Sequence, residues 1–490
     1  MSRVTRRTII KGGALIALDA SLPRVARAQP RIILNDASRL SPTPVFHHWL
    51  ARTDHQADFI ADLRRELKAA AAERRPVAVS AARHSMGGQS LPRDGVAMTF
   101  ASTRCEPNTT AKTYLVDGAT RWQHVISVLD PLRFSPAVMQ SNNDFGIAAT
   151  FSVNAHGWPV PHGPFGSTVR SFRLMLADGT IVTCSRTENA ELFQLAMGGY
   201  GLFGIILELE VEMVQNLALR PSHNVMPAKD FGARFIEAVH GDPLVLLAYG
   251  RLNVTRSNFF EEALLVTYRQ VPGNAPLPPA GTGGLVASVS RQMYRAQDGS
   301  EGAKRLRWFL ESVVQPIAGS GDATRNTLLN EPVANLASGD RTRTDILHEY
   351  FVPPERFADF IDACRQIIPP SPLELLNITM RYVDPDRHSV LAFAPDRRIA
   401  AVMAFSQQVS PEGEAEMMRI TEALIDRVIA MGGSFYLPYR LHARCDQVAK
   451  AYPNLERFIT RKRHYDPRLL FRNAMWQTYF AGDCAPRTRG

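Results

Sequence analysis

Residues 76–90 read PVAVSAARHSMGGQS, and they decide how the rest of the chain is interpreted. The apolar run 77–79 predicts a short strand, which leads into a loop of small residues and glycines around a single histidine, His84. Small residues and glycines let backbone N–H groups approach a phosphate closely. The loop matches neither the G-x-G-x-x-G pattern nor the G-x-x-x-x-G-K-[ST] pattern. We therefore interpret it as a phosphate-binding loop of another kind that carries a reactive side chain.

Apolar spacing on both sides of this loop predicts helices and strands in alternation. Residues 140–168 stand apart, because they are low in charge, rich in small polar residues and interrupted by glycine and proline. Such a segment is expected to form no regular core element, and a long irregular stretch in a compact domain is more often functional than idle. The predicted helices are 54–74 and 120–129, and the predicted strands are 77–79, 95–99, 113–119, 169–176, 180–184, 205–214 and 377–381.

The composition is that of a folded protein with large apolar cores. The chain has 490 residues, of which 45% are hydrophobic and 21% are charged, so two or three domains are expected and disorder is excluded. The formal net charge is +9, but residues 1–28 contain six basic residues and one acidic residue. The rest of the chain is only mildly basic, which argues against a nucleic-acid partner.

The N-terminus has the pattern of an export signal. Residues 5–11 read TRRTIIK, and a short apolar stretch and Ala26-Arg27-Ala28 follow. This pattern predicts a twin-arginine signal in residues 1–28, cleavage after Ala28, and a periplasmic or otherwise exported protein. The apolar stretch is shorter than the roughly 18–20 residues that a spanning helix needs, so we expect no transmembrane segment. An ordinary basic amphipathic N-terminus is the alternative.

Cysteine and histidine spacing predicts no metal site. The five cysteines are scattered without a C-x-x-C pair, and their odd number and wide spacing indicate no particular disulfide. His156 and His162 lie six residues apart in a loop rich in glycine and proline, which does not favour a metal either. The locally basic segment 291–310 is interpreted as a solvated amphipathic helix, with contact to a membrane surface as the minority alternative.

Several motifs, each weak alone, together resemble one family through their order and spacing. They are Arg83-His84-Ser85 after a strand, the turns 154–157 and 165–166, Ala177-Asp178-Gly179, the run 198–204 (GGYGLFG), and Tyr465-Asp466-Pro467 with Phe471 and Asn473. The chain resembles flavoproteins of the vanillyl-alcohol oxidase type, whose PCMH-type FAD-binding fold is shared by cytokinin dehydrogenases, alditol oxidases and aldonolactone oxidases. The resemblance covers most of 46–215 and returns at 431–480.

This resemblance implies an α+β protein in which an FAD-binding domain of two parts is combined with a mixed α/β cap domain for the substrate. The FAD-binding domain is expected at 39–215 and the cap domain at 216–430. A C-terminal segment, 431–490, is expected to return to the FAD-binding domain.

The resemblance also implies that the opening loop wraps the FAD pyrophosphate and that His84 is linked covalently to the flavin 8α-methyl group. Imidazole suits this role because it is a largely neutral nucleophile near pH 7. A histidine that only hydrogen-bonds the flavin is the alternative. Relatives usually have two glycines where this chain has Ala148-Ala149. The implied cofactor-binding residues are Ala82, Arg83, His84, Ser85, Met86, Gly87, Gln89, Ser141, Gly146, Thr150, Asn154, His156, Gly157, Gly204, Ile205 and Asn473.

The reaction implied by the resemblance is hydride transfer from a hydroxyl-bearing small molecule (an alcohol, polyol or lactone) to flavin N5, with O₂ or another acceptor reoxidising the flavin. A predicted strand places Asn377, Thr379 and Arg381 on one face. Arg381 matches an arginine of alditol oxidases, whereas Thr379 replaces their glutamate. Asp144 lies near the position of a catalytic aspartate of cytokinin dehydrogenases, and Tyr436 is a third catalytic candidate. The alternatives are amine oxidation of the cytokinin dehydrogenase type and a non-catalytic flavin protein that binds or relays electrons.

Overall fold

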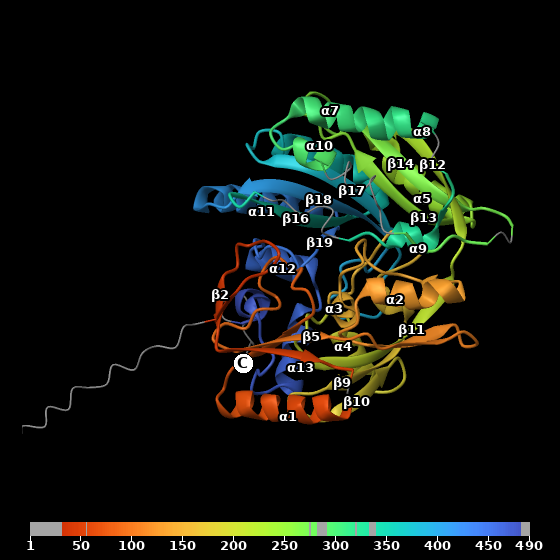
Figure 1. Cartoon of the computed structure of the whole chain (residues 1–490). Coiled ribbons are helices and arrows are strands. Elements are labelled where there is room, and N and C mark those ends of the chain that lie inside the picture. Colours follow the sequence, from red (N-terminus) through yellow and green to blue (C-terminus); the bar gives the residue numbers. More distant parts are fainter. Residues whose placement is uncertain are drawn as a thin grey trace, which may run out of the picture. The chain divides into compact units, whose positions relative to one another are not determined.

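The computed structural model describes residues 32–54, 56–273, 276–281, 292–318, 321–332 and 340–481. The predicted export signal lies outside these residues. The described chain has an α+β fold, which confirms the predicted class, and Figure 1 shows its elements in two groups, one above the other. We call residues 32–215 with 436–481 the lower half, and residues 216–435 the upper half.

The lower half contains a parallel sheet, an antiparallel sheet and a small antiparallel pair formed by its first two strands. Its strands are β1 (Ile32–Leu34), β2 (Thr43–Val45), β3 (His47–Arg52), β4 (Val77–Ser80), β5 (Val96–Ala101), β6 (Cys105–Asn108), β7 (Thr113–Asp117), β8 (Phe134–Pro136), β9 (Val169–Met175), β10 (Ile181–Ser185) and β11 (Ile205–Gln215). The parallel sheet has the order β3-β5-β4, and the antiparallel sheet has the order β10-β9-β11-β7-β6, with β8 beside β11. The helices are α1 (Gln56–Ala72), α2 (Trp122–Leu129), α3 (Ile147–Ser152), α4 (Ala190–Ala196), α12 (Cys445–Ala451) and α13 (Leu455–Tyr465).

The upper half is one antiparallel sheet of eight strands with helices around it. The strand order is β15-β12-β14-β13-β17-β18-β16-β19. The strands are β12 (Ala218–Pro227), β13 (Val245–Leu252), β14 (Glu262–Gln270), β15 (Ala323–Thr324), β16 (Arg343–Val352), β17 (Glu374–Val383), β18 (Arg398–Gln408) and β19 (Ser434–Phe435). The helices are α5 (Phe231–Gly241), α7 (Glu301–Phe309), α8 (Gln315–Ala318), α9 (Arg325–Leu329), α10 (Phe357–Ile367) and α11 (Pro411–Ala430).

The two faces of this upper sheet are chemically different, because successive side chains of a strand point to opposite faces. In β17 the buried Ile378 and Met380 belong to the apolar core, which also contains Phe231 of α5 and residues of α10 and α11. In β16, His348 hydrogen-bonds Thr421 of α11 at 3.2 Å. The intervening residues of both strands, which include polar and charged side chains, face the lower half.

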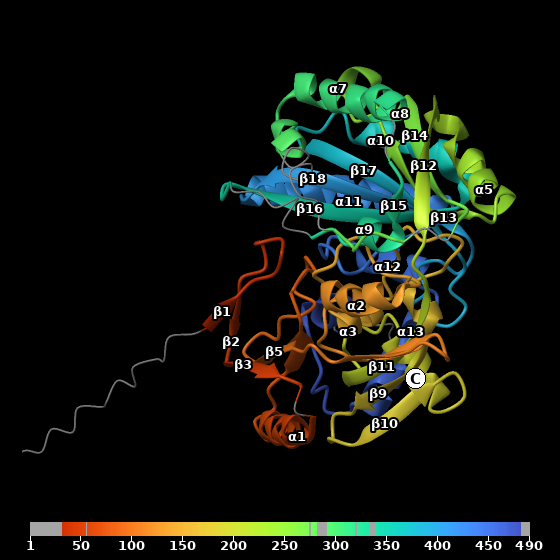
Figure 2. The same cartoon turned by 45° about the vertical axis from the view of Figure 1, so that its right-hand side comes forward.

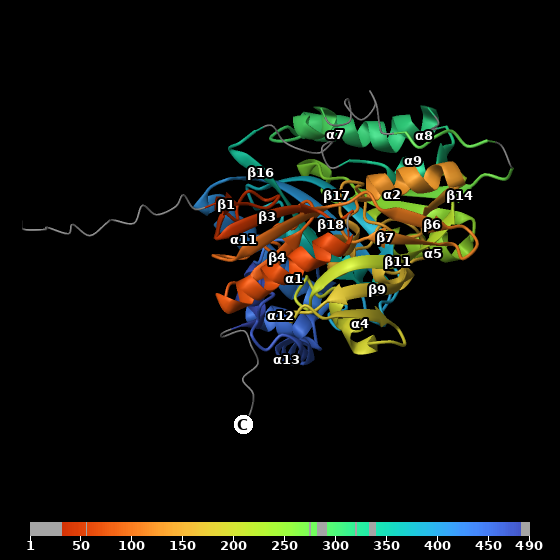
Figure 3. The ribbon, with the colours of Figure 1, turned by 60° about the horizontal axis from the view of Figure 1, so that its bottom comes forward.

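The chain returns to the lower half after β19. Figures 2 and 3 show α12 and α13, in blue, among the elements of the lower half, with α13 beside α4. Arg461 of α13 forms an ion pair with Glu191 of α4. Lys462, fully buried, pairs with Asp466 and donates to the carbonyl of Leu202. Burial lowers the pKa of Lys462 to about 8, although Asp466 opposes this shift.

The helices and strands predicted from apolar spacing are confirmed, with ends shifted by a few residues. The predicted hairpin turns at Asp178 and Gly179, where the glycine has a φ of +84°. The expectation of no regular element in 140–168 is wrong for α3. Ala148 and Ala149 are strong helix formers, and Phe151 comes four residues after Ile147 so that both are fully buried on one side.

The structure also bears on the predicted basic helix and on the cysteines. The predicted basic helix 291–310 is interrupted: residues 292–296 are helical, 297–300 are not, and α7 begins at Glu301, where the Ser300 hydroxyl accepts the N–H of Ala303 at 3.3 Å. Among the described cysteines, three are free thiols and Cys445 is disulfide-bonded. In the part of the chain that the structure describes, no helix has the length and apolar character needed to cross a membrane.

Candidate functional site

A cavity of about 1030 Å³ lies between the lower half and the polar face of the upper sheet. Its lower wall comes from the segments 79–90, 140–158 and 200–206, and its upper wall from β13, β16, β17 and β18. The volume is at the upper end of the roughly 300–1,000 Å³ typical of small-molecule sites. The cavity can therefore hold a large cofactor together with a small second molecule.

The first part of the opening loop presents donors to the cavity. Arg83 has a φ of +54°, which turns the backbone sharply after β4 and brings His84 and Ser85 onto the wall. Among the described residues, the N–H groups of Arg83, His84 and Ser85 have no hydrogen-bond acceptor. Nη1 of Arg83 is buried and also lacks one. This arrangement suits an anionic ligand.

The second part of the loop is fixed from behind by the segment that follows β19. Oε1 of Gln89 accepts the N–H of Gly87 at 2.8 Å, and Nε2 of Gln89 donates to the carbonyls of Leu437 and Tyr439 at 2.8 and 2.9 Å. A Cβ at Gly87 would lie 2.5 Å from the Tyr439 carbonyl oxygen, so only glycine allows this contact. We call these contacts the Gln89 clasp.

A glutamine next to the predicted Ser141 presents another donor to the cavity. Oε1 of Gln140 accepts hydrogen bonds from Nε1 of Trp122 at 3.1 Å and from the hydroxyl of Thr150 at 2.7 Å. These two bonds fix the amide, so that its Nε2 is buried on the cavity wall without an acceptor among the described residues. Sequence analysis did not identify Gln140 as a site residue. It did identify the adjacent Ser141, which was the signal that this segment reaches the site.

His84 is held at the cavity wall by two neighbours. Its ring stacks on Phe145 with 4.2 Å between the ring centroids, and Nε2 lies 3.3 Å from Oδ2 of Asp144. Asp144 itself is not part of the cavity wall. The predicted catalytic aspartate is thus a neighbour of the predicted flavin-linked histidine.

Three titratable side chains from distant parts of the chain meet on the cavity wall. Glu349 of β16 is buried and contacts Nε2 of His156, and its second oxygen accepts the hydroxyl of Tyr439 at 3.1 Å. Burial, together with the Glu349 charge, raises the pKa of Tyr439 well above its usual range. Tyr436 also lines the cavity, but its hydroxyl donates to the carbonyl of Val153 at 2.8 Å.

The upper wall carries arginines. Asn377, Thr379 and Arg381 of β17 line the cavity, as the alternation predicted. Arg251 of β13 lies opposite Thr379 in the sheet. Nη1 of Arg251 donates to Oδ1 of Asn377 at 2.5 Å and to Oγ1 of Thr379 at 2.7 Å. Arg307 of α7 completes this side of the wall.

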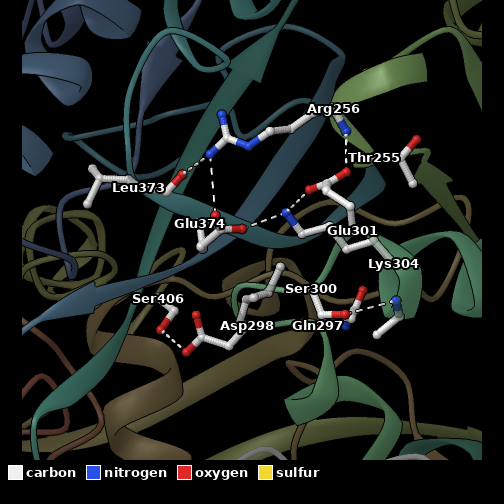
Figure 4. A network of polar contacts seen from close by, with 12 residues as sticks. Thr255, Arg256, Gln297, Asp298, Ser300, Glu301, Lys304, Leu373, Glu374 and Ser406 are labelled. Carbon is white, nitrogen blue, oxygen red and sulfur yellow. Dashed lines mark hydrogen bonds and ion pairs between the residues drawn. The ribbon is translucent and has the colours of Figure 1, made fainter.

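A polar network holds α7 against the sheet. Figure 4 shows Glu374, the first residue of β17, between Arg256 and Lys304. The buried Lys304 contacts Glu374 at 2.6 Å and Glu301 at 2.8 Å, and Arg256 contacts Glu374 at 3.3 Å. The network places the next turn of α7, with Arg307, at the cavity.

The predicted site residues fall into two groups. Those that the structure brings together on the cavity wall are Ala82, Arg83, His84, Ser85, Met86, Gln89, Ser141, Gly146, Thr150, His156, Gly204, Ile205, Arg381 and Tyr436. Gly87, Asp144, Asn154, Gly157 and Asn473 lie behind it. Asn154 hydrogen-bonds Asp386 and the N–H of Gly166, and Asn473 donates to the carbonyls of Gln89 and Tyr200. A Cβ at Gly157 would lie 1.9 Å from the Met139 carbonyl oxygen.

Glu349 and Arg251 are functional candidates that sequence analysis missed. A signal for Glu349 was present, because an acidic residue stands beside the apolar run Tyr350-Phe351-Val352. Such a carboxylate faces the opposite side of a strand from its apolar neighbour. No comparable local signal singles out Arg251, whose place depends on the pairing of β13 with β17.

The lower wall fits FAD. The unpartnered groups of the opening loop and of Gln140 are all donors, as pyrophosphate and flavin oxygens require. A Cβ at Gly146 would lie 2.6 Å from the Cβ of Ala81, so glycine lets these two segments of the wall pack against each other. Gly204 has a φ of +154°, which favours glycine. The opening loop, Gln140 and these glycines would hold the cofactor.

Comparison with known proteins identifies the same region. Residues 56–185 match the family model described as an FAD binding domain. An uncharacterized oxidoreductase of a fasciation locus in Rhodococcoides fascians is 27% identical over 157 residues, which cover 31% of this chain and 35% of that protein. Cytokinin dehydrogenase 3 of Oryza sativa subsp. japonica is 31% identical over 142 residues, 28% of this chain and 27% of that protein. Cytokinin dehydrogenase 1 of Arabidopsis thaliana is 29% identical over 135 residues, covering 26% of this chain and 24% of that enzyme.

The Gln89 clasp gives a testable prediction for the cofactor wall. Gln89→Leu keeps the approximate size of the side chain and leaves the Gly87 N–H and two carbonyls without their partner. We expect the free energy of unfolding to fall by about 1–3 kcal/mol, the cost of unsatisfied buried groups, and FAD to bind more weakly. Thermal unfolding and FAD titration measure both effects. Gln123→Leu, at an exposed position of α2, is the matched control; equal behaviour of the two variants would contradict the clasp.

The matched segment and the lower wall of the cavity coincide over the opening loop and residues 140–158. The matched parts span only about a quarter to a third of the length of these relatives. The upper half contributes nothing to the family match. The chain thus carries an FAD-binding domain of the PCMH type, with distant homology to cytokinin dehydrogenases and FAD oxidoreductases.

Proposed function

We propose that the protein is an FAD-dependent oxidoreductase that takes hydride from the C–H bond of a hydroxyl-bearing small molecule. One observation carries this proposal: the cavity joins a wall that fits FAD to a wall of titratable side chains from the upper sheet. FAD supplies the hydride acceptor when it is bound. The upper half then acts as the cap domain for the substrate. O₂ or another acceptor completes the cycle.

Oxidation of a hydroxyl group also releases a proton, which the protein has to accept. We assign this role to Glu349, working through the hydroxyl of Tyr439, because both line the cavity and are in contact. Tyr436 is less suited, because its hydroxyl donates to a backbone carbonyl. Asp144 is less suited, because it lies behind the wall and beside His84.

Glu349→Gln tests both the oxidation and the proton acceptor. Wild-type protein should lose flavin absorbance under anaerobic conditions with at least one member of a panel of alcohols, polyols, lactones and amines. Glutamine keeps the size and most hydrogen bonds of the site but is a poor base. We therefore expect flavin reduction to slow by roughly 10²–10⁴-fold, the usual contribution of a general base, with FAD content unchanged.

The exposed Glu237 of α5 provides the control for this experiment. Glu237→Gln should reduce as fast as wild type. An unchanged rate in Glu349→Gln would remove Glu349 from the reaction. A panel in which amines alone bleach the flavin would favour the amine-oxidising alternative. No bleaching by any compound would favour the non-catalytic alternative.

We further propose that His84 binds the flavin covalently. The support is its position on the lower wall, where the ring is held by stacking on Phe145 and by the contact of Nε2 with Asp144 at 3.3 Å. Acid-precipitated wild-type protein should keep its yellow colour, and His84→Ala should release all flavin to the supernatant while remaining folded. Flavin retained in the His84→Ala pellet would overturn the assignment.

We also propose that the protein is exported. The support is the twin arginine at Arg6 and Arg7, followed by a short apolar stretch and an A-x-A site. In a Gram-negative host, the wild-type protein should accumulate in the periplasm. The variant with Arg6→Lys and Arg7→Lys should stay in the cytoplasm, as immunoblots of the two fractions would detect. Equal distribution of both proteins would contradict the proposal.

A further inference from the structure

The upper wall contains two arginines without a carboxylate partner. Nη1 of Arg251 is bonded only to neutral oxygens, those of Asn377 and Thr379. Nη1 of Arg381 is buried and has no acceptor among the described residues. In the described part of the chain neither guanidinium is in direct contact with a carboxylate, although the charge of Glu349 acts on Arg381 and Arg251 acts on the charge of Glu311. Both residues line the cavity, so their unused donors are available to whatever enters it.

The sheet register brings these two charges together. Arg251 pairs with Thr379, so Arg381, two residues further along β17, is its diagonal neighbour on the same face. Diagonal neighbours have Cα atoms about 7–8 Å apart. Burial, with a smaller contribution from the charge of Arg251, lowers the pKa of Arg381 to about 10 although the charge of Glu349 opposes the shift, so Arg381 is still a cation at neutral pH. Two half-buried cations on one face repel each other, and an anion bound between them would relieve this repulsion.

The other charged groups of this wall are in direct contact with further side chains. Arg307 contacts Oε1 of Glu311 at 2.7 Å. Asp345 forms a double contact with Arg295. Glu349 is engaged by His156 and by the Tyr439 hydroxyl, as described above. Arg251 and Arg381 are therefore the arginines of the upper wall that have no carboxylate in direct contact among the described residues.

A third unused donor lies in the same region. Nε1 of Trp158 is buried without an acceptor among the described residues. The Trp158 ring contacts that of Tyr249 at 5.4 Å between centroids, and the guanidinium of Arg251 lies 5.5 Å from the centre of the Tyr249 ring. Trp158 and Arg251 therefore flank the same tyrosine. The groups of Arg251, Arg381 and Trp158 that have unused hydrogen-bonding capacity are all donors. They would suit a ligand rich in acceptor oxygens.

We propose that the substrate carries a carboxylate, which binds Arg381 and Arg251, so that the compound oxidised is a hydroxy acid. Arginine matches a planar carboxylate with two parallel hydrogen bonds. The FAD pyrophosphate is not this anion, because its donors lie on the lower wall. The inference rests on the proposed oxidoreductase function and adds the class of substrate to it.

The test compares acids with neutral compounds of the same skeleton. Gluconate is paired with sorbitol, and lactate with propane-1,2-diol, so that each pair differs in one carboxylate. Anaerobic flavin reduction gives kcat/KM, and calorimetry on the FAD-loaded protein gives the affinity of each compound. We expect at least one acid to exceed its neutral partner by about tenfold or more in both measurements.

Arginine variants link this preference to the site. Arg381→Met and Arg251→Met should each lower kcat/KM and affinity for the acid by about 10–100-fold more than for the neutral partner, the factor of a lost charged hydrogen bond. Arg381→Lys should recover part of the affinity. The exposed Arg269 of β14, paired with Asp242, provides the control, because Arg269→Met should leave all values unchanged.

The outcomes separate this inference from the proposed function. If acids and their neutral partners reduce the flavin equally well, the carboxylate site is overturned while the proposed oxidoreductase function stands. The same holds if Arg381→Met lowers kcat/KM equally for both compounds of a pair. That second result would place Arg381 against the flavin. Acid binding that depends on Arg381 without any flavin reduction would support the anion site and overturn the proposed function. Absence of any acid preference in the wild-type protein overturns the inference even if the variants fail to fold.

Discussion

The clasp between the opening loop and the segment after β19 is the interaction on which the cavity depends. Gln89 joins two parts of the chain that are about 350 residues apart in sequence, since its amide bonds the carbonyls of Leu437 and Tyr439. Arg440 strengthens the joint, because it donates to the carbonyl of Met86 and pairs with Glu414 of α11. The cofactor wall is thereby fastened to the helices of the upper half.

The carboxyl group of Glu414, which pairs with Arg440 at this joint, stays ionised. Burial alone would raise the pKa of its carboxyl, but His442 and Arg440 together lower it to about 2. The ion pair with Arg440 therefore persists across the whole physiological pH range. A change of pH within this range therefore leaves this fastening of the loop intact.

Sequence patterns were sufficient for most of the local elements and insufficient for the way that distant segments meet at the cavity. The loop around His84, the hairpin at Gly179 and the strand of Arg381 are local patterns, and local patterns specify local structure. The positions of Gly87 and Asn473 behind the cavity wall depend on contacts with residues far away in sequence. The same is true of Glu349 and Arg251, which reach the site only through the strand order of the eight-stranded sheet. No spacing within a single segment contains that order.

The strand order has a geometric consequence for ligands. Glu349 on β16 and Arg381 on β17 are separated by β18, whose Val402 and Ala404 line the cavity between them. Adjacent strands lie about 4.8 Å apart, so the two backbones are held roughly 10 Å from each other. The sheet thus sets the distance between the acidic side chain of Glu349 and the basic side chain of Arg381. Since hydrogen bonds fix that spacing, ligand length can be retuned at this face mainly by the bulk of the side chains at Val402 and Ala404.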